Sequence, residues 1–344
     1  PFFMFLAYDT PHAALQLPTQ AYPAGGGLSG GLQWLGTPSN MINTASGTID
    51  SYRHPDYTGQ GWSDVAERFA TGVRRIDDGV GDLVQTLQDL NIDTNTLVVF
   101  SSDNGPHSES YMSTASYSPQ AFDSYGPFDG IKRDCWEGGI RVPTLVRWPG
   151  MVSSNAVVEQ PSQFHDWLTT FADAAGVSAP ARMDGVSLLP TLTGSGIQKE
   201  SLTYIEYYST QKTPNYTDFD SSHRKRARNQ MQVIFQDGFK GVRVNIGSHA
   251  DDFEIYDLSA DPKELNDLAP GMSGLQAQMK NRVLQIRRSD SAAARPYDNE
   301  LVPPIAETVA NGLNVKTYEG SWDWVPAFEN IMHAGTNTVA GLST

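Results

Sequence analysis

The chain has 344 residues, of which 39% are hydrophobic and 10% aromatic, enough for one large domain or two ordinary ones with a sizeable core. Its formal net charge of −15 argues against a general binder of nucleic acid or anionic membranes, because such a protein would present a basic surface. The longest apolar run, Phe2 to Ala7, is far shorter than the ~20 residues that a transmembrane helix needs.

The first hundred residues show the order strand, helix, strand. Residues 1–8 form a continuous apolar run, which is typical of a strand buried on both faces. Apolar residues recur at steps of three and four from Val65 to Leu90 and predict a helix, and residues 97–100 predict a second strand. This order implies a right-handed crossover and a largely parallel sheet. Because the chain opens inside a predicted strand, we expect its natural amino terminus to be missing.

The remainder of the chain changes character near residue 197. Before that point the pattern predicts a strand over residues 142–148 and a helix over residues 164–175. After it, short part-polar strands in succession predict an antiparallel sheet: residues 202–208, 231–235, 239–246 and 253–258. One more helix is marked by Leu275, Met279, Val283 and Ile286. We therefore predict an α/β region over 1–196, a small antiparallel-sheet subdomain over 197–290, and an irregular tail over 291–344 that packs on the core.

Chemically useful side chains follow the first two predicted strands. His12 comes directly after the first strand, and Asp103 and Asn104 come directly after the second. Both loops would open on the carboxyl edge of the parallel sheet, where open α/β sheets bind their ligands. Asp103 and Asn104 offer a carboxylate and an amide oxygen side by side, as calcium and magnesium prefer. Taken alone, an Asp-Asn-Gly triplet is more often a turn, and a His after Pro is more often structural.

A third segment, before the predicted strand over residues 142–148, carries Lys132 and Glu137-Gly138-Gly139. With it, five landmarks in chain order resemble the sulfatases of the alkaline-phosphatase-like superfamily, from the first residue to about Leu268. They are residues 2–12, 95–105, Lys132 with 136–143, 184–190, and 254–258 with 261–264. The resemblance implies a mixed, mostly parallel sheet flanked by helices, plus a small antiparallel C-terminal sheet with one helix. It makes residues 1–196 the C-terminal part of the catalytic domain.

The resemblance also implies a role for each matching residue. Asp103 and Asn104 would bind calcium, His12 would donate a proton to the leaving alcohol, and Lys132 would stabilise charge at the bridging oxygen. The chemistry agrees, because cleavage of a sulfate ester builds negative charge on the leaving oxygen, where a cation, an ammonium group and an acid should converge.

The family's nucleophile is a formylglycine, made from the Cys or Ser of a Cys/Ser-x-Pro-x-Arg motif that lies before the Pro-His strand. We expect neither this motif nor a nucleophile in this chain, since that part would be missing together with the amino-side Asp-Asp metal ligands. The single cysteine, Cys135, is followed by Trp136 and Glu137 and is expected to pack as a small buried residue. The chain by itself is then expected to be inactive.

Two further sets of residues are weaker candidates for substrate binding. His107, just past the metal pair, could touch substrate or be structural, with neither reading favoured. The basic run from His223 to Arg228 could be a solvated loop. Alternatively its arginines could bind sulfates or carboxylates of a glycan, since guanidinium forks suit such anions: Arg224, Arg226 and Arg228.

The sequence as a whole is interpreted as part of a sulfuric ester hydrolase that acts on a sulfated carbohydrate or an aryl sulfate, as in polysaccharide degradation. Its expected cofactors are calcium and, in the missing part, formylglycine. We expect no nucleic-acid partner and no transmembrane segment, and the resemblance implies a periplasmic or secreted location. The alternatives are a phosphodiesterase or phosphonate monoester hydrolase of the same superfamily, or a catalytically inactive fragment or binding module.

Overall fold

The computed structural model describes residues 2–12, 15, 17, 32–34, 41–43, 52–109, 117–303 and 312–340. The chain divides into two compact units. Unit 1 comprises residues 1–149, 212–226 and 262–265, and unit 2 comprises residues 150–211, 227–261 and 266–344. The domain boundaries near residues 196 and 290 remain predictions.

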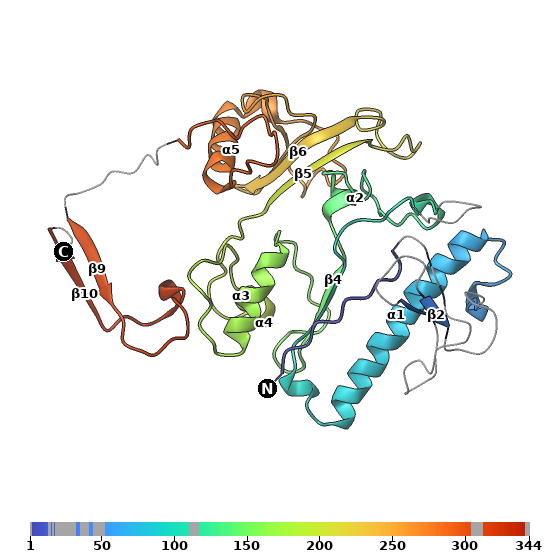
Figure 1. Ribbon diagram of the computed structural model, residues 1–344, viewed down its shortest axis with the longest axis horizontal. Coiled ribbons are helices and arrows are strands. Elements are labelled where there is room, and N and C mark those ends of the chain that lie inside the picture. The colour runs from blue at the N-terminus through green and yellow to red at the C-terminus, as the bar shows by residue number, and fades with distance from the viewer. Residues whose placement is uncertain are drawn as a thin grey trace. The chain divides into compact units, whose positions relative to one another are not determined.

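Unit 1 contains the long helix α1, Asp64–Asp89 (Figure 1). The Ser63 side chain caps it by accepting a hydrogen bond from the backbone N–H of Ala66 at 3.3 Å. Val65 and Leu87, members of the predicted apolar stripe, are buried, so the predicted helix is confirmed. The shorter helices of the unit are η1 (Pro55–Tyr57), η2 (Asp93–Asn95), η3 (Pro119–Ala121) and α2 (Glu137–Ile140).

Two strands of unit 1 lie where the sequence predicts them. Strand β3, Val98–Ser101, pairs antiparallel with β4, Thr144–Arg147, so that Val98 is opposite Arg147 and Ser101 is opposite Thr144. A second antiparallel pair, β1 (Leu32–Trp34) with β2 (Met41–Asn43), lies in a stretch for which the sequence predicts no strand.

The predicted buried strand at the start of the chain is not found. Residues 2–9 are not assigned to a strand, and Phe2, Phe3 and Phe5 are 62%, 70% and 80% exposed. A continuous apolar run becomes a buried strand only when other elements cover both of its faces, and the described residues leave these side chains largely uncovered. The parallel pairing expected between residues 1–8 and 97–100 is therefore absent from the described part of the chain.

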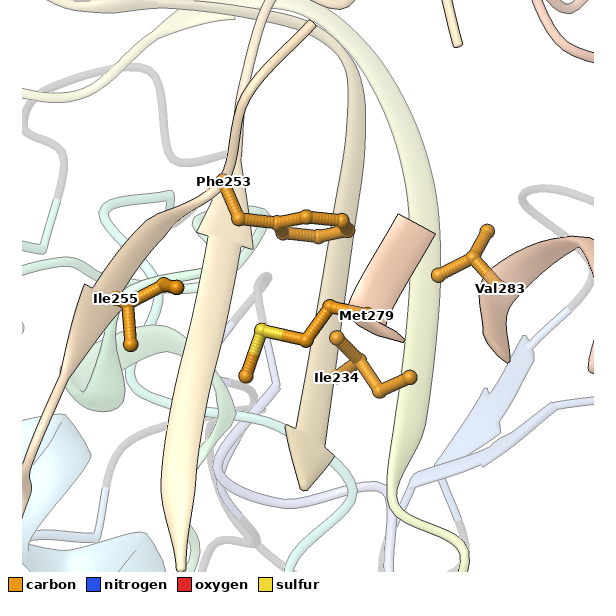
Figure 2. Packing of buried hydrophobic residues seen from close by; sticks show 5 residues of the cluster. All are labelled: Ile234, Phe253, Ile255, Met279 and Val283. Atoms are coloured by element: carbon orange, nitrogen blue, oxygen red, sulfur yellow. The ribbon is translucent and has the colours of Figure 1, made fainter. Parts of the chain in front are cut away.

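Unit 2 contains the predicted antiparallel sheet and its helix. Four strands lie in the order β5-β6-β7-β8: β5 is Tyr204–Lys212, β6 is Ala227–Gln236, β7 is Phe239–Arg243 and β8 is Glu254–Tyr256. Helix α5, Ser273–Ile286, packs on the sheet. Ile234, Phe253 and Ile255 of the sheet side meet Met279 and Val283 of the helix, and all five are at most 1% exposed (Figure 2).

The rest of unit 2 consists of short elements. These are α3 (Phe164–Ala174), α4 (Leu189–Thr193), η4 (Ala269–Gly271), β9 (Leu313–Thr317), η5 (Phe328–Asn330) and β10 (Gly335–Val339). Strands β9 and β10 pair antiparallel, which the sequence did not predict (Figure 1). Among the described residues, no helix is both long enough and apolar enough to span a membrane.

Candidate active site

Backbone hydrogen bonds join the loop after β3 to α2 and to the loop that leads into α2. The N–H of Gly105 donates to the carbonyl oxygen of Gly139 at 2.9 Å, and the N–H of Lys132 donates to that of Pro106 at 2.8 Å. The contact is close enough that a Cβ on Gly105 would collide with the carbonyl oxygen of Gly138. The Asp-Asn-Gly triplet and the Glu-Gly-Gly triplet, distant in the sequence, are thus held against each other by main chain.

His12 and Lys132 lie side by side, although 120 positions separate them in the sequence. The Nζ atom of Lys132 is 3.1 Å from Nε2 of His12. An ammonium group has no acceptor, so Nζ donates and Nε2 accepts, which places the proton of a neutral His12 on Nδ1. Two of the predicted site residues are therefore within hydrogen-bond distance.

His107 is buried and holds the peptide that precedes His12. Its Nε2 donates to the carbonyl oxygen of Pro11 at 2.9 Å, while its Nδ1 accepts from the N–H of Glu109 at 3.0 Å. The rings of Phe69 and Tyr117 lie against it. Burial lowers the pKa of His107 below its ordinary value. These contacts support the structural reading of His107, because its two ring nitrogens are both engaged inside the unit.

Asp103 and Asn104 follow β3, and their side-chain oxygens match calcium in kind. Asp103 is exposed, and the side-chain amide of Asn104 donates to the carbonyl oxygen of Gly105 at 2.9 Å, which leaves its Oδ1 for another partner. Two oxygens are fewer than the ~6–8 that calcium takes, so this pair can supply only part of a site. No cluster of three or more metal-binding side chains lies within the described ranges.

The loop that carries Lys132 is fixed by buried carboxylates. Asp134 accepts hydrogen bonds from the N–H of Ile131 at 2.9 Å and from the hydroxyl of Thr213 at 2.7 Å. The first residue of α2, Glu137, donates its N–H to the carboxylate of Glu264 at 2.8 Å. Cys135 is 1% exposed, so the prediction that it packs as a buried residue is confirmed.

The arginines of the basic run make contacts within the fold. Arg224 donates to the carbonyl oxygens of Phe219 and Thr217, at 2.6 and 2.7 Å. The guanidinium of Arg226 lies over the ring of Trp136, 5.2 Å from its centroid. Arg228 is 3% exposed. A residue that contacts a glycan must lie on the surface, so Arg228 does not belong to the candidate site.

One pentapeptide departs from the expectation that the chain lacks a Cys/Ser-x-Pro-x-Arg motif. Residues 178–182 read Ser-Ala-Pro-Ala-Arg and match the motif with serine. The stretch follows α3 in unit 2 and is bound to a later segment: Ala181 donates its N–H to Val325, and the carbonyl oxygen of Ala179 accepts from Ala327. The pentapeptide belongs to unit 2, whereas His12 and Lys132 belong to unit 1. The spacing of the pentapeptide does not by itself make Ser178 the nucleophile.

Comparison with known proteins links both units to one group of hydrolases. The family profile described as Sulfatase matches residues 1–177, and the profile described as N-sulphoglucosamine sulphohydrolase, C-terminal, matches residues 124–289. The chain is 34% identical to human N-acetylgalactosamine-6-sulfatase over 160 residues, 45% of this chain and 29% of that protein. It is 29% identical to rat steryl-sulfatase over 258 residues, 72% of this chain and 42% of that protein.

A likeness to a solved structure confirms the fold class. The crystal structure of Ps i-CgsB superposes with a TM-score of 0.50 at 23% identity, covering 66% of this chain and 44% of that one. The fold is the alkaline-phosphatase-like α/β architecture with its small antiparallel C-terminal sheet. The chain spans less than half the length of each of these relatives.

Proposed function

We propose, since this chain belongs to the sulfatase family, that the protein carrying it hydrolyses a sulfuric ester. The observation that carries the proposal is the 3.1 Å contact between Lys132 and His12, both within the stretch that matches the family. A cation and an imidazole at this separation can reach the same substrate oxygen. The buried polar anchors of the Lys132 loop support this reading, because a catalytic cation needs a fixed position.

The two side chains would divide the work at the leaving group. Hydrolysis breaks the bond between sulfur and the bridging oxygen, and that oxygen must gain a proton as it leaves. We assign this proton transfer to His12, because imidazole is the side chain most often used for general acid catalysis. Lys132 would stabilise the negative charge that develops on the same oxygen.

Calcium and a nucleophile are the remaining requirements of the proposed reaction. Asp103 and Asn104 would hold the calcium, which when bound supplies positive charge for the sulfate oxygens. Their oxygens fit this ion in kind but are too few to bind it alone, so further ligands must come from other residues. The formylglycine nucleophile is not assigned to any residue of this chain.

A sulfated carbohydrate is the proposed substrate. N-acetylgalactosamine-6-sulfatase, at 34% identity, is named for a sulfated sugar and supports this choice. Steryl-sulfatase, at 29% identity, is named for a sulfated sterol, so a steryl sulfate is the natural comparison substrate. We also propose a periplasmic or secreted location, which is supported by membership of the family and can be tested by fractionating cells that produce the protein.

The test is turnover of an aryl sulfate and of sulfated glycans by the active protein that contains this chain. We expect His12→Ala to lower kcat/KM about 10²–10⁴-fold and Lys132→Ala about 10²–10³-fold. His333→Ala and Lys316→Ala are matched controls, because both side chains are exposed in unit 2, and they should leave the rate unchanged.

A phosphonate monoester and a phosphodiester complete the assay. Faster turnover of either than of every sulfate ester would favour the alternative hydrolases of the superfamily. We expect the isolated 344-residue chain to be inactive. Turnover by that chain, abolished by His12→Ala, would show that it carries its own nucleophile.

A further inference from the structure

A fully buried hydrogen-bonded pair, His223 and Asp129, lies next to the loop that carries Lys132. Nδ1 of His223 is 2.8 Å from Oδ2 of Asp129, and both side chains are 0% exposed. The same carboxylate oxygen accepts the N–H of Asp220 at 2.7 Å, and Lys263 lies 3.4 Å from the other oxygen. Buried charges are tolerated only when they are paired and hydrogen-bonded, so this carboxylate is strongly committed to its three partners.

Asp129 stands at the start of the Lys132 loop and closes it. Its backbone carbonyl accepts the N–H of Gly138 at 2.8 Å, which brings the two ends of residues 129–138 together. Lys132 lies between these ends, and its own N–H is bound to Pro106. A shift of Asp129 would therefore be transmitted to Lys132 by main chain.

His223 belongs to the segment of residues 213–226 between β5 and β6, and this segment packs on the same loop. The His223 ring stacks on Trp136 with 4.0 Å between ring centroids and 25° between planes. Phe219, 1% exposed, lies in one apolar cluster with Ile131, the neighbour of Lys132. The segment thus contacts the loop near both of its ends, and all of these residues belong to unit 1.

We infer that Asp129 and His223 are positioning residues, which fix the place of the Lys132 ammonium group by clamping residues 213–226 onto the loop. The inference rests on the proposed function of Lys132. It differs from a general stabilising role, because it predicts that the pair acts on catalysis only through Lys132.

The first experiment needs no catalytic activity. Amide hydrogen exchange is measured on the 344-residue chain and on a His223→Phe variant, which keeps a ring against Trp136 but removes the donor to Asp129. We expect the Lys132 and Gly138 amides to exchange about tenfold faster or more, with the amides of α1 little changed. Leu87→Ala, which opens a cavity in α1, is the control for general destabilisation. Equal acceleration in both segments, or none, overturns the inference.

The second experiment is a double-mutant cycle on kcat/KM in the active protein. His223→Phe should lower kcat/KM by roughly a hundredfold, as expected for a misplaced catalytic group. In a Lys132→Ala background the same change should cost less than about threefold, because the group that it positions is already gone. His223→Asn, which offers a donor near the position of Nδ1, should restore most of the rate. If the factors by which His223→Phe and Lys132→Ala lower kcat/KM multiply in the double variant, the pair is only structural.

The two experiments separate the possible failures. Faster exchange in the Lys132 loop together with an inactive protein would leave the clamp standing and contradict the proposed function. Unchanged exchange in an active sulfatase would contradict the clamp alone. If His223→Phe does not fold, Asp129→Ala replaces it in both experiments, because it removes the oxygen that pairs with His223.

Discussion

The core of unit 2 and the site of unit 1 are held together by different forces. In unit 2, apolar side chains such as Ile234, Phe253 and Met279 pack a sheet against a helix. In unit 1, the site loops are held by Asp129, His223 and other buried polar groups. Apolar contacts depend on volume and tolerate similar shapes, whereas buried hydrogen bonds depend on partners and geometry. Substitutions in the two regions should therefore fail in different ways.

Met279→Ala should have the largest effect on stability. The side chain is 0% exposed within the core of Figure 2, so its removal leaves a cavity and should lower the free energy of unfolding by about 2–5 kcal/mol. The measurement is urea unfolding followed by circular dichroism. Met332→Ala is the control, because Met332 is 91% exposed; it should change the free energy of unfolding by less than about 0.5 kcal/mol. A small effect of Met279→Ala would break the distinction between the two regions.

Gly105→Ala should damage the site more than the fold. The added Cβ would collide with the carbonyl oxygen of Gly138, so one of the two site loops must move. Because the same loops carry Asp103 and Lys132, we expect a loss of kcat/KM on the order of a hundredfold. Gly274→Ala in α5 has open space around the new methyl group and should be neutral or stabilising by about 0.4–1 kcal/mol. An active Gly105→Ala protein would show that the loops can separate without harm.

His107 should make the stability of unit 1 depend on pH in a modest way. Its pKa is lowered by burial, so below about pH 6.5 the unfolded chain binds a proton that the folded chain does not. Stability contributed at this site is therefore present above the unfolded pKa and is lost as the pH falls below it. His107→Gln should reduce the difference in unfolding free energy between pH 7 and pH 5, measured by urea unfolding at the two pH values. A larger difference in His107→Gln would mean that the sign is wrong.

Ser178→Ala should have no effect on turnover. The serine matches the Ser-x-Pro-x-Arg spacing, but its stretch is paired with residues 325–327 of unit 2. The measurement is kcat/KM on an aryl sulfate, with mass spectrometry of the peptide to look for conversion of the serine to an aldehyde. Loss of activity or detection of the aldehyde would assign the nucleophile to this chain and require a new account of the site.

Elements that rest on local periodicity were predictable. The stripe that predicts α1 lies within one helix, and the short strands from β5 to β8 each have their own pattern and turns. The neighbourhood of His12 and Lys132 was predictable from family motifs, because motifs report which loops meet even when the sequence spacing is large.

Features that depend on distant partners were not predictable. Asp129 and His223 are 94 positions apart. The basic run that begins at His223 gives no sign of Asp129 as its partner, so only the fold brings the two together. The burial of Arg228 was missed for the same reason, since a run of basic residues looks solvated until the packing of its segment is known. The strand predicted over residues 2–9 is not formed, because an apolar run becomes a buried strand only where other elements pack against both of its faces.

The exposed phenylalanines at the start of the chain affect its solubility. Contiguous apolar surface favours self-association, while a net charge of −15 keeps molecules apart in dilute buffer. Added salt shortens the range of that repulsion, to roughly 10 Å at 0.1 M, and strengthens rather than weakens apolar contact when the salt is a sulfate or phosphate. The purified chain should thus be most soluble at low ionic strength. Among added salts, ammonium sulfate should precipitate it at the lowest concentration.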